Sequence, residues 1–237
     1  MLIGMMWLFL LIAAALVPGM VSGQAVVDLL PNLAPLPASD LKLQTVDTTT
    51  LLRFSTTSWN SGSGPLELRG AEIIDNKENV YQRIYRSDST FYDRLAGSFV
   101  WHPQHGHFHF DDYALYTLSK VGSPGASDRI SSKTTFCIID TTRIDTKLPG
   151  APNRAVYGGC SKLQGMSVGW GDTYKYYLFG QSIDVTGLED GEYVLTITVD
   201  PKGRLAEANT GDNVSSVNLL LQNGRVCNLS SQGNRCH

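Results

Sequence analysis

Glu192-Tyr193-Val194-Leu195-Thr196-Ile197-Thr198-Val199 is the stretch that most clearly decides the fold class. Its apolar side chains alternate with polar ones, which places one apolar and one polar face on the two sides of an extended chain. Gly191 precedes the stretch as a turn residue, and Asp200-Pro201-Lys202-Gly203 ends it. The pattern predicts a half-buried β-strand.

Similar runs, rich in β-branched and aromatic residues and bounded by turn residues, occur along the rest of the chain. They lie at Leu51–Trp59, Leu66–Arg69, Phe108–Leu118, Thr134–Asp140, Ser182–Val185 and Val214–Leu221. No stretch of twelve or more residues carries the apolar period of a helix. Short strands separated by turns are typical of antiparallel sandwiches and barrels. We predict an all-β protein, an antiparallel β-sandwich with long irregular loops and little helix.

Residues 141–173 differ from these runs because they contain six glycines and Pro152. We expect a long irregular connection there, and loops of such length are usually functional or disordered. No internal repeat, low-complexity tract or linker divides the chain. We therefore predict a single domain over residues 24–237.

Composition excludes several classes of protein. The 237 residues carry 19 Lys+Arg and 22 Asp+Glu, a net charge of −3, and 42% of them are hydrophobic. A disordered chain has fewer apolar residues and a stronger net charge. A nucleic-acid-binding protein usually has a basic surplus, which is missing here, so we expect no nucleic-acid partner.

Residues 1–23 predict a secretory signal peptide. They contain no charged side chain, run apolar from Leu2 to Val17, and end in small residues before Gln24. The alternative is an uncleaved membrane anchor, since the run nearly reaches the roughly 20 residues that a span requires. Pro18 and Gly19 interrupt the run and favour cleavage. We expect a secreted, extracellular protein without stable membrane insertion after cleavage.

The four cysteines lie after this segment, and an even number in an oxidising compartment predicts two disulfides. Three pairings are possible. We favour Cys137–Cys160 and Cys227–Cys236, because the second pair closes a short C-terminal loop and leaves the first two cysteines as partners. The alternative is a set of free buried thiols, which an exported protein disfavours.

Four of the five histidines fall within Trp101-His102-Pro103-Gln104-His105-Gly106-His107-Phe108-His109-Phe110. On a strand, His105, His107 and His109 share one face, and the phenylalanines point to the opposite face, toward the core. Gly106 permits the bend that brings the imidazoles together. Three neutral imidazoles with an open position suit Cu(II) or Zn(II), and ligand type alone does not choose between them.

A solvated polar strand face is the alternative to a metal site, and the repeat at i, i+2 and i+4 favours the metal. His102 has the other parity and precedes a break at Pro103, so we expect it beside the ligands rather than among them. Asp111 and Asp112 are candidates to orient a ligand imidazole through its second nitrogen, or are solvated at the strand edge.

The histidine segment resembles the copper-binding sequence of the lysyl oxidases, secreted amine oxidases that act on peptidyl lysine. Further similar segments follow in the same order, and together they cover most of residues 50–221. These segments are Lys133-Thr134-Thr135-Phe136-Cys137, Gln164-Gly165-Met166-Ser167, Asp172-Thr173-Tyr174, Gly191-Glu192-Tyr193 and Glu207-Ala208-Asn209-Thr210-Gly211-Asp212-Asn213.

The resemblance implies roles for Lys133 and Tyr174 that the sequence alone does not assign. A lysine is usually solvated, and one of ten tyrosines is usually a core or rim residue. In the family the two corresponding side chains cross-link to lysine tyrosylquinone, a self-derived cofactor made with bound copper and O₂. We therefore expect Lys133 and Tyr174 as cofactor and catalytic residues, and His105, His107 and His109 as ligands of Cu(II).

The implied reaction is oxidative deamination of a primary amine, such as a lysine side chain of an extracellular protein. The unprotonated amine attacks a quinone carbonyl, and a general base removes a proton from the carbon beside nitrogen. An aldehyde, ammonia and hydrogen peroxide are released, with O₂ as the electron acceptor. The family's vertebrate members carry a further histidine where this chain has Leu115, so the base is open, with Asp111 or Asp112 as candidates.

Three hypotheses of different classes follow. The first is the copper- and quinone-dependent amine oxidase. The second is a non-catalytic secreted copper-binding or adhesion module on a β-sandwich, which binds metal but forms no quinone. The third is a zinc hydrolase with a three-histidine site, which requires a carboxylate or an activated water near the metal.

Overall fold

The computed structural model describes residues 25–74, 77–103, 105–123, 125, 128–230 and 235–236. The predicted signal peptide lies outside these residues, so the division into a signal peptide and a single domain stays a prediction. Within the described ranges there is no helix, and hence none able to cross a membrane. The all-β prediction is confirmed.

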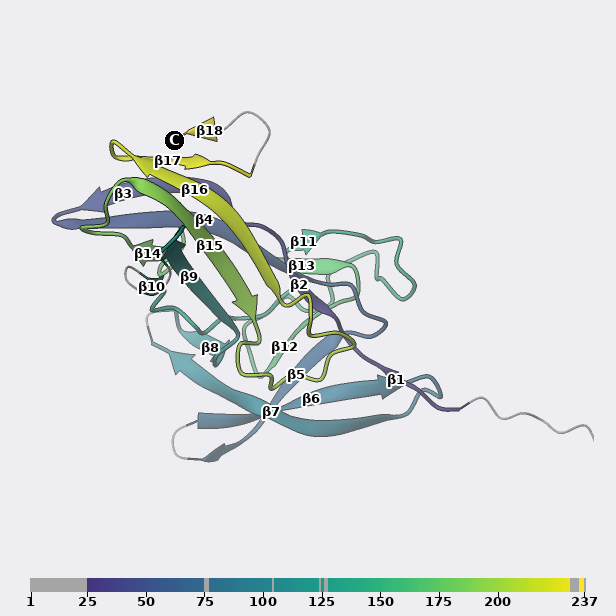
Figure 1. The fold of residues 1–237 in the computed structure, drawn as a ribbon. Helices are drawn as coiled ribbons and strands as arrows, with labels where there is room; N and C mark the ends of the chain where they lie inside the picture. The colour runs from purple at the N-terminus through teal and green to yellow at the C-terminus, as the bar shows by residue number, and fades with distance from the viewer. Residues whose placement is uncertain are drawn as a thin grey trace, which may run out of the picture.

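The strands form three sheets, drawn in Figure 1. The first has the order β12-β5-β6-β7-β8, with β1 beside β6; the second has the order β10-β9-β15-β16-β17-β18; the third is built on β4, which pairs with β2, β3, β13 and β14. The strands are β1 Asp28–Leu29, β2 Leu33–Pro35, β3 Ser39–Val46, β4 Thr49–Asn60, β5 Leu66–Ile74, β6 Lys77–Arg86, β7 Phe91–His102, β8 His107–Phe110, β9 Ala114–Lys120, β10 Arg129–Ile130, β11 Thr142–Arg143, β12 Leu163–Met166, β13 Trp170–Tyr174, β14 Ser182–Asp184, β15 Gly191–Val199, β16 Val214–Gln222, β17 Arg225–Asn228 and β18 Arg235–Cys236.

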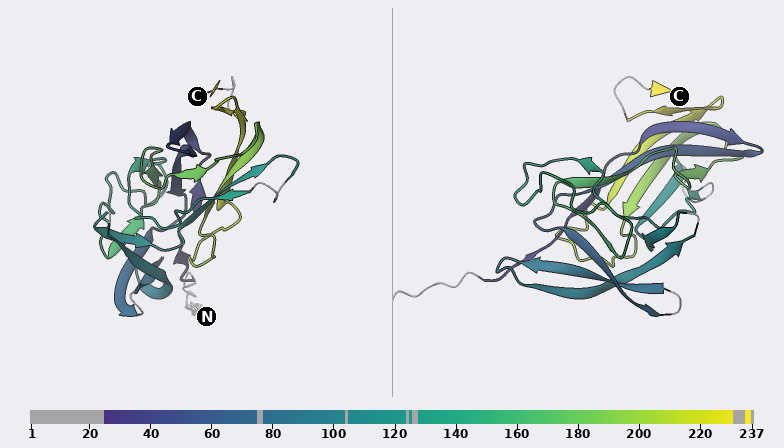
Figure 2. Two further views of the ribbon diagram at one scale, coloured as in Figure 1. Left: turned by 90° about the vertical axis from the view of Figure 1, so that its left-hand side faces the viewer. Right: turned by 180° about the vertical axis from the view of Figure 1, so that it is seen from behind.

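The β9-β15-β16 layer packs against the β4 layer in a sandwich-like arrangement. In β15 the alternation is as predicted, because Tyr193, Leu195 and Ile197 are buried while the residues between them are partly exposed. Strand β15 pairs antiparallel with β9 on one side and β16 on the other. Each large apolar side chain buried in this way contributes about 1.5–3 kcal/mol. The twisted β5-β6-β7 sheet lies across one end, as both views in Figure 2 show.

Two predicted strands differ in the structure. The run Phe108–Leu118 is divided into β8 and β9, because the chain turns at Asp112, which has a φ of 56°, and passes from the first sheet to the second. The run 134–140 forms only an isolated bridge between Phe110 and Phe136. Its amide groups at Cys137 and Ile138 instead donate to side chains, so no ladder forms.

The prediction of an irregular connection over residues 141–173 was partly wrong. The region contains β11, β12 and most of β13. Its glycines at 165 and 171 are needed because a Cβ there would collide with the backbone of Leu66 and Ser58 on the neighbouring strands. These glycines therefore mark close strand packing rather than a loop.

Both predicted disulfides are present. Cys137 is bonded to Cys160, and Cys227 to Cys236, and no cysteine is free in the described residues. Disulfides of this kind are typical of extracellular proteins.

Candidate metal and quinone site

The histidine segment is a hairpin rather than a single strand. Strand β7 ends at His102, the amides of His105 and Gly106 donate to the carbonyl of His102, and β8 begins at His107. Gly106 has a φ of 67°, the left-handed conformation that a glycine adopts without strain. The reversal pairs His102 with His107 across the two strands. It therefore brings His102 to the side of the other three histidines, which a straight strand would not do.

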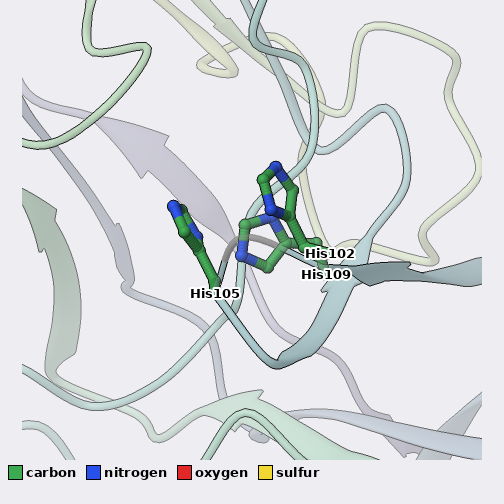
Figure 3. A group of neighbouring side chains, drawn as sticks. All are labelled: His102, His105 and His109. Atoms are coloured by element: carbon green, nitrogen blue, oxygen red, sulfur yellow. The ribbon is translucent and has the colours of Figure 1, made fainter.

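The four imidazole rings converge beside this turn. The His102 ring stacks on that of His105 with 4.2 Å between centroids, and lies 4.8 Å from that of His109. The His105 ring is 5.3 Å from both His107 and His109, and the Nε2 atoms of His107 and His109 are 2.9 Å apart. Figure 3 shows three of these rings, His102, His105 and His109, gathered beside the turn.

Burial favours the neutral form of His105, His107 and His109. It lowers the pKa of His105 and His107, and together with the nearby charge of Lys133 it lowers the pKa of His109 to about 3. The other nitrogen of His109, Nδ1, lies 3.2 Å from the hydroxyl of Thr135. A hydroxyl thus orients the most buried ring, a task that the sequence had suggested for Asp111 or Asp112.

The donor set fits a late transition-metal ion. The ligand atoms of His102, His105 and His109 lie within 4.8 Å of one another. The Nε2 atom of His107 lies 2.9 Å from that of His109. Donors that share one ion at about 2.0–2.1 Å are at most about 4.2 Å apart, so the rings need to close by less than about 1 Å. Nδ1 of His102 is buried without a hydrogen-bond partner. Neutral imidazoles suit copper or zinc.

Lys133 reaches this region because the segment that follows it is fastened to β8. The amide of Phe110 donates to the carbonyl of Phe136, and the amide of Phe136 donates back to Phe110. The Lys133 Nζ atom lies 5.1 Å from the ring centroid of Phe136 and 5.3 Å from that of Tyr174. Burial lowers the pKa of this amine, and no carboxylate lies at ion-pair distance from it within the part of the chain that the structure covers.

Tyr174 is held by strand β13, where it lies opposite Thr56 of β4. Its hydroxyl donates to the carbonyl of Cys137 at 2.7 Å and accepts from the amide of Cys137 at 2.9 Å. Its ring packs edge-on against Phe136 at 4.8 Å. Burial raises the pKa of the phenol well above its usual value. The disulfide at Cys137 therefore fixes the peptide that positions the phenol.

All five side chains predicted from the sequence line one cavity of about 260 Å³. Its other lining residues are apolar or neutral, apart from one acid, Asp172. The full lining is His105, His107, His109, Lys133, Cys137, Ile139, Thr141, Cys160, Asp172, Thr173, Tyr174, Leu178 and Phe179. The structure therefore brings the predicted residues together, while their chemical roles stay predictions.

Sequence reasoning missed three features of this site. It did not foresee that the hairpin turn stacks the His102 ring on that of His105. It did not single out Asp172, which lies two residues before Tyr174 on strand β13 and therefore on the same face. It also passed over Phe179, whose ring is 69% exposed and lies edge-on to His105 at 6.3 Å.

Asp111 and Asp112 do not line the cavity. The Asp111 carboxylate accepts from the Lys77 amine at 2.9 Å, and that of Asp112 lies 3.3 Å from the Arg204 guanidinium. Both are ion pairs at the start of the β8–β9 turn. The structure thus gives neither of them access to a substrate in the cavity.

Comparison with known proteins gives the family that the sequence motifs resemble. The chain is 29% identical over 159 residues to lysyl oxidase homolog 4 of Mus musculus, and the matched region covers 62% of this chain and 20% of that protein. It is 27% identical over 175 residues to lysyl oxidase homolog 2A of Danio rerio, with 68% and 22% covered. Against lysyl oxidase homolog 1 of Homo sapiens it is 32% identical over 128 residues, with 54% and 21% covered.

The matched region thus spans about a fifth of these relatives' length. The lysyl oxidase family model matches residues 79–230, which include the hairpin, Lys133, the disulfide Cys137–Cys160 and Tyr174. This match extends over more than half of the chain, and the chain therefore belongs to the lysyl oxidase family.

Proposed function

We propose that the protein is a secreted, copper-dependent amine oxidase whose quinone cofactor derives from Lys133 and Tyr174. It oxidises primary amines, such as lysine side chains of extracellular proteins, to aldehydes with release of ammonia and hydrogen peroxide. The observation that carries the proposal is the single cavity that holds the imidazoles, the Lys133 amine and the Tyr174 ring. Family membership supports the same activity.

His105, His107 and His109 would hold Cu(II), with His102 beside them. Because burial keeps the imidazoles neutral, the copper ion does not compete with protons for their lone pairs at neutral pH. Copper and O₂ supply the oxidation that forms the cofactor, and the quinone supplies an electrophilic carbonyl and an electron sink.

Lys133 and Tyr174 are arranged for the cross-link. A lysine must lose its proton to act as a nucleophile, and burial beside the Phe136 ring lowers the pKa of Lys133 in that direction. The amide and the carbonyl of Cys137 both bind the Tyr174 hydroxyl, so the orientation of the ring in the cavity is fixed. The distance of 5.3 Å from Nζ to the ring centroid requires only a small movement of a flexible side chain.

The cavity wall favours an amine with an apolar stem. Ile139, Leu178 and Phe179 contribute apolar surface, and the disulfide closes one side. Such a lining excludes water and favours the neutral amine over the ammonium ion, and only the neutral amine attacks a carbonyl.

The test is quinone formation in protein produced with copper. We expect quinone staining, visible absorbance and an intact mass that differs from that of the two-disulfide chain by added oxygen and a cross-link. Peroxide release from primary amines should accompany it. Lys133→Ala and Tyr174→Phe should abolish all of these signals, because each removes one half of the cofactor.

Lys175→Ala and Tyr177→Phe serve as matched controls, because these neighbours of Tyr174 are largely exposed and line no part of the cavity. Both should retain the quinone. A wild-type mass that shows only the two disulfides, with copper bound, would contradict the proposal and identify the non-catalytic copper-binding module instead.

A further inference from the structure

The proposed reaction requires a group that removes a proton from the carbon beside the amine nitrogen, and the cavity contains one carboxylate. Asp172 lies in its wall and is 3% exposed. The remaining titratable groups of the wall are already committed, the histidines to the metal and Lys133 and Tyr174 to the cofactor. Asp111 and Asp112 point elsewhere and are paired with Lys77 and Arg204.

Strand β13 places Asp172 next to the reacting centre. Asp172 and Tyr174 are two residues apart, opposite Ser58 and Thr56 of β4, and therefore lie on the same face of the strand. Both side chains reach the same neighbouring segment: Tyr174 binds the peptide of Cys137, and Asp172 accepts from the amide of Ile139. The carboxylate is thus displaced from the phenol by one strand repeat, about 7 Å along the chain.

The surroundings of Asp172 leave it free to exchange a proton. Its oxygens accept two long hydrogen bonds from neutral groups, 3.4 Å from the amide of Ile139 and 3.3 Å from the hydroxyl of Thr141. No cation is at ion-pair distance from it within the described ranges. A carboxylate that served only to hold the fold would have strong donors, as Asp140 has from the amide and the hydroxyl of Ser167.

Burial and one neighbouring charge raise the pKa of Asp172 by more than its hydrogen bonds from Ile139, Thr141 and Thr173 lower it. Burial raises the pKa of Asp172 to about 8, and the negative charge of Asp140 adds to the effect. On its inner side Asp172 borders a small void, with room for one water-sized group, next to Tyr113 and Tyr116. A base that ionises near the working pH combines a usable unprotonated fraction with enough basicity.

We propose that Asp172 is the general base that takes the proton from the carbon beside the amine nitrogen of the bound substrate. The inference rests on the proposed function. In this step the C–H bond would break and its proton would pass to a carboxylate oxygen of Asp172, while a quinone derived from Lys133 and Tyr174 would be the oxidant that accepts the electron pair. Asp172 later returns this proton to solvent or product, so the base is regenerated.

Asp172→Asn is the direct test, because the amide keeps the shape and can keep one of the two accepted hydrogen bonds but cannot take up the proton. We expect quinone content equal to wild type and kcat for amine oxidation lowered by about 10²–10⁴-fold. With substrate deuterated at the carbon beside nitrogen, the isotope effect on kcat should rise, since proton removal becomes the slow step. Asp111→Asn is the matched control and should retain wild-type kcat and isotope effect.

Infrared difference spectra of copper-free protein give a readout that does not depend on activity. We expect a band of a protonated carboxylic acid that is lost as pH rises through about 8 in the wild type and in Asp111→Asn, and is missing in Asp172→Asn. Should Asp172→Asn fail to fold, Asp172→Glu takes its place; it keeps the titrating band but shifts the carboxylate by one methylene, and kcat should fall.

The outcomes separate the two proposals. Wild-type protein with quinone and activity, together with a fully active Asp172→Asn, overturns the role of Asp172 alone. A variant that lacks the quinone places Asp172 in cofactor formation and also overturns its role in turnover. An Asp172 carboxyl group that stays ionised between pH 5 and 9 also overturns the role of Asp172 as the base. Wild-type protein without quinone overturns both proposals.

Discussion

His109 and His102 differ in how deeply each is fixed in the site. His109 is 1% exposed, its Nδ1 lies beside the Thr135 hydroxyl, and its Nε2 lies beside that of His107. His102 stacks on His105 and has a buried nitrogen with no partner. In the proposed copper site, His109 is therefore a ligand and His102 a supporting residue beside it.

We therefore expect His109→Ala to lower the affinity for copper by more than 100-fold, and His102→Ala to lower it by about 10–100-fold, the range of groups that orient ligands. The measurement is a competition titration with a copper chelator, monitored by the visible spectrum of the bound ion. A loss for His102→Ala as large as that for His109→Ala would show that His102 is itself a ligand.

At the scale of elements, the connection between β13 and β14 covers the lysine. Gly180 lies there with a φ of 73°, and a Cβ built on it would be 3.2 Å from Cδ and 3.3 Å from Cβ of Lys133. The glycine therefore leaves the space that the lysine stem occupies. The same connection carries Leu178 and Phe179 to the cavity.

Gly180→Ala is expected to lower the quinone yield, because the new methyl group displaces Lys133 from its position near the Tyr174 ring. Gly187→Ala is the matched control, since Gly187 has a φ of 74° and open space around its Cβ position. Each substitution should cost about 1 kcal/mol of stability through its left-handed backbone. The yield is measured by quinone staining per mole of copper. Equal yields in the two variants would refute the packing role of Gly180.

Hydrogen-bond partners explain why some elements were predicted and others were not. The alternation in β15 is a local property, and it predicted the strand correctly. The segment 134–140 has similar composition, but its amides are taken by Tyr174, Gln164 and Asp172, which lie between 26 and 37 residues further along the chain. Periodicity within a segment contains no information about such distant acceptors.

At the scale of the whole molecule, the two disulfides have different relations to the site. Cys137–Cys160 closes a separation of 23 residues and lines the cavity, and its first cysteine carries the peptide that holds Tyr174. Cys227–Cys236 closes a separation of 9 residues at the C-terminal edge of the second sheet.

Replacing either pair by alanine should lower the free energy of unfolding by about 3 kcal/mol, since both loops are short and of similar closure entropy. Only the Cys137→Ala/Cys160→Ala variant should also lose quinone formation, because the Tyr174 anchor becomes mobile. Denaturant titration measures the first effect, and quinone staining of the remaining folded protein measures the second. Normal quinone yield in that variant would show that the anchor does not depend on the disulfide.

The sequence by itself predicted the all-β class, the favoured pairing of the cysteines and five of the residues that meet in the cavity. These features follow from local alternation, from the number and spacing of the cysteines, and from short motifs with a family resemblance. The tertiary structure decided the rest. Only the hairpin reversal brings His102 to the other histidines, and only the register of β13 on β4 sets Asp172 beside Tyr174. The physical reason is that chain reversal and strand register depend on hydrogen bonds between distant segments, whereas alternation and motifs are properties of neighbouring residues.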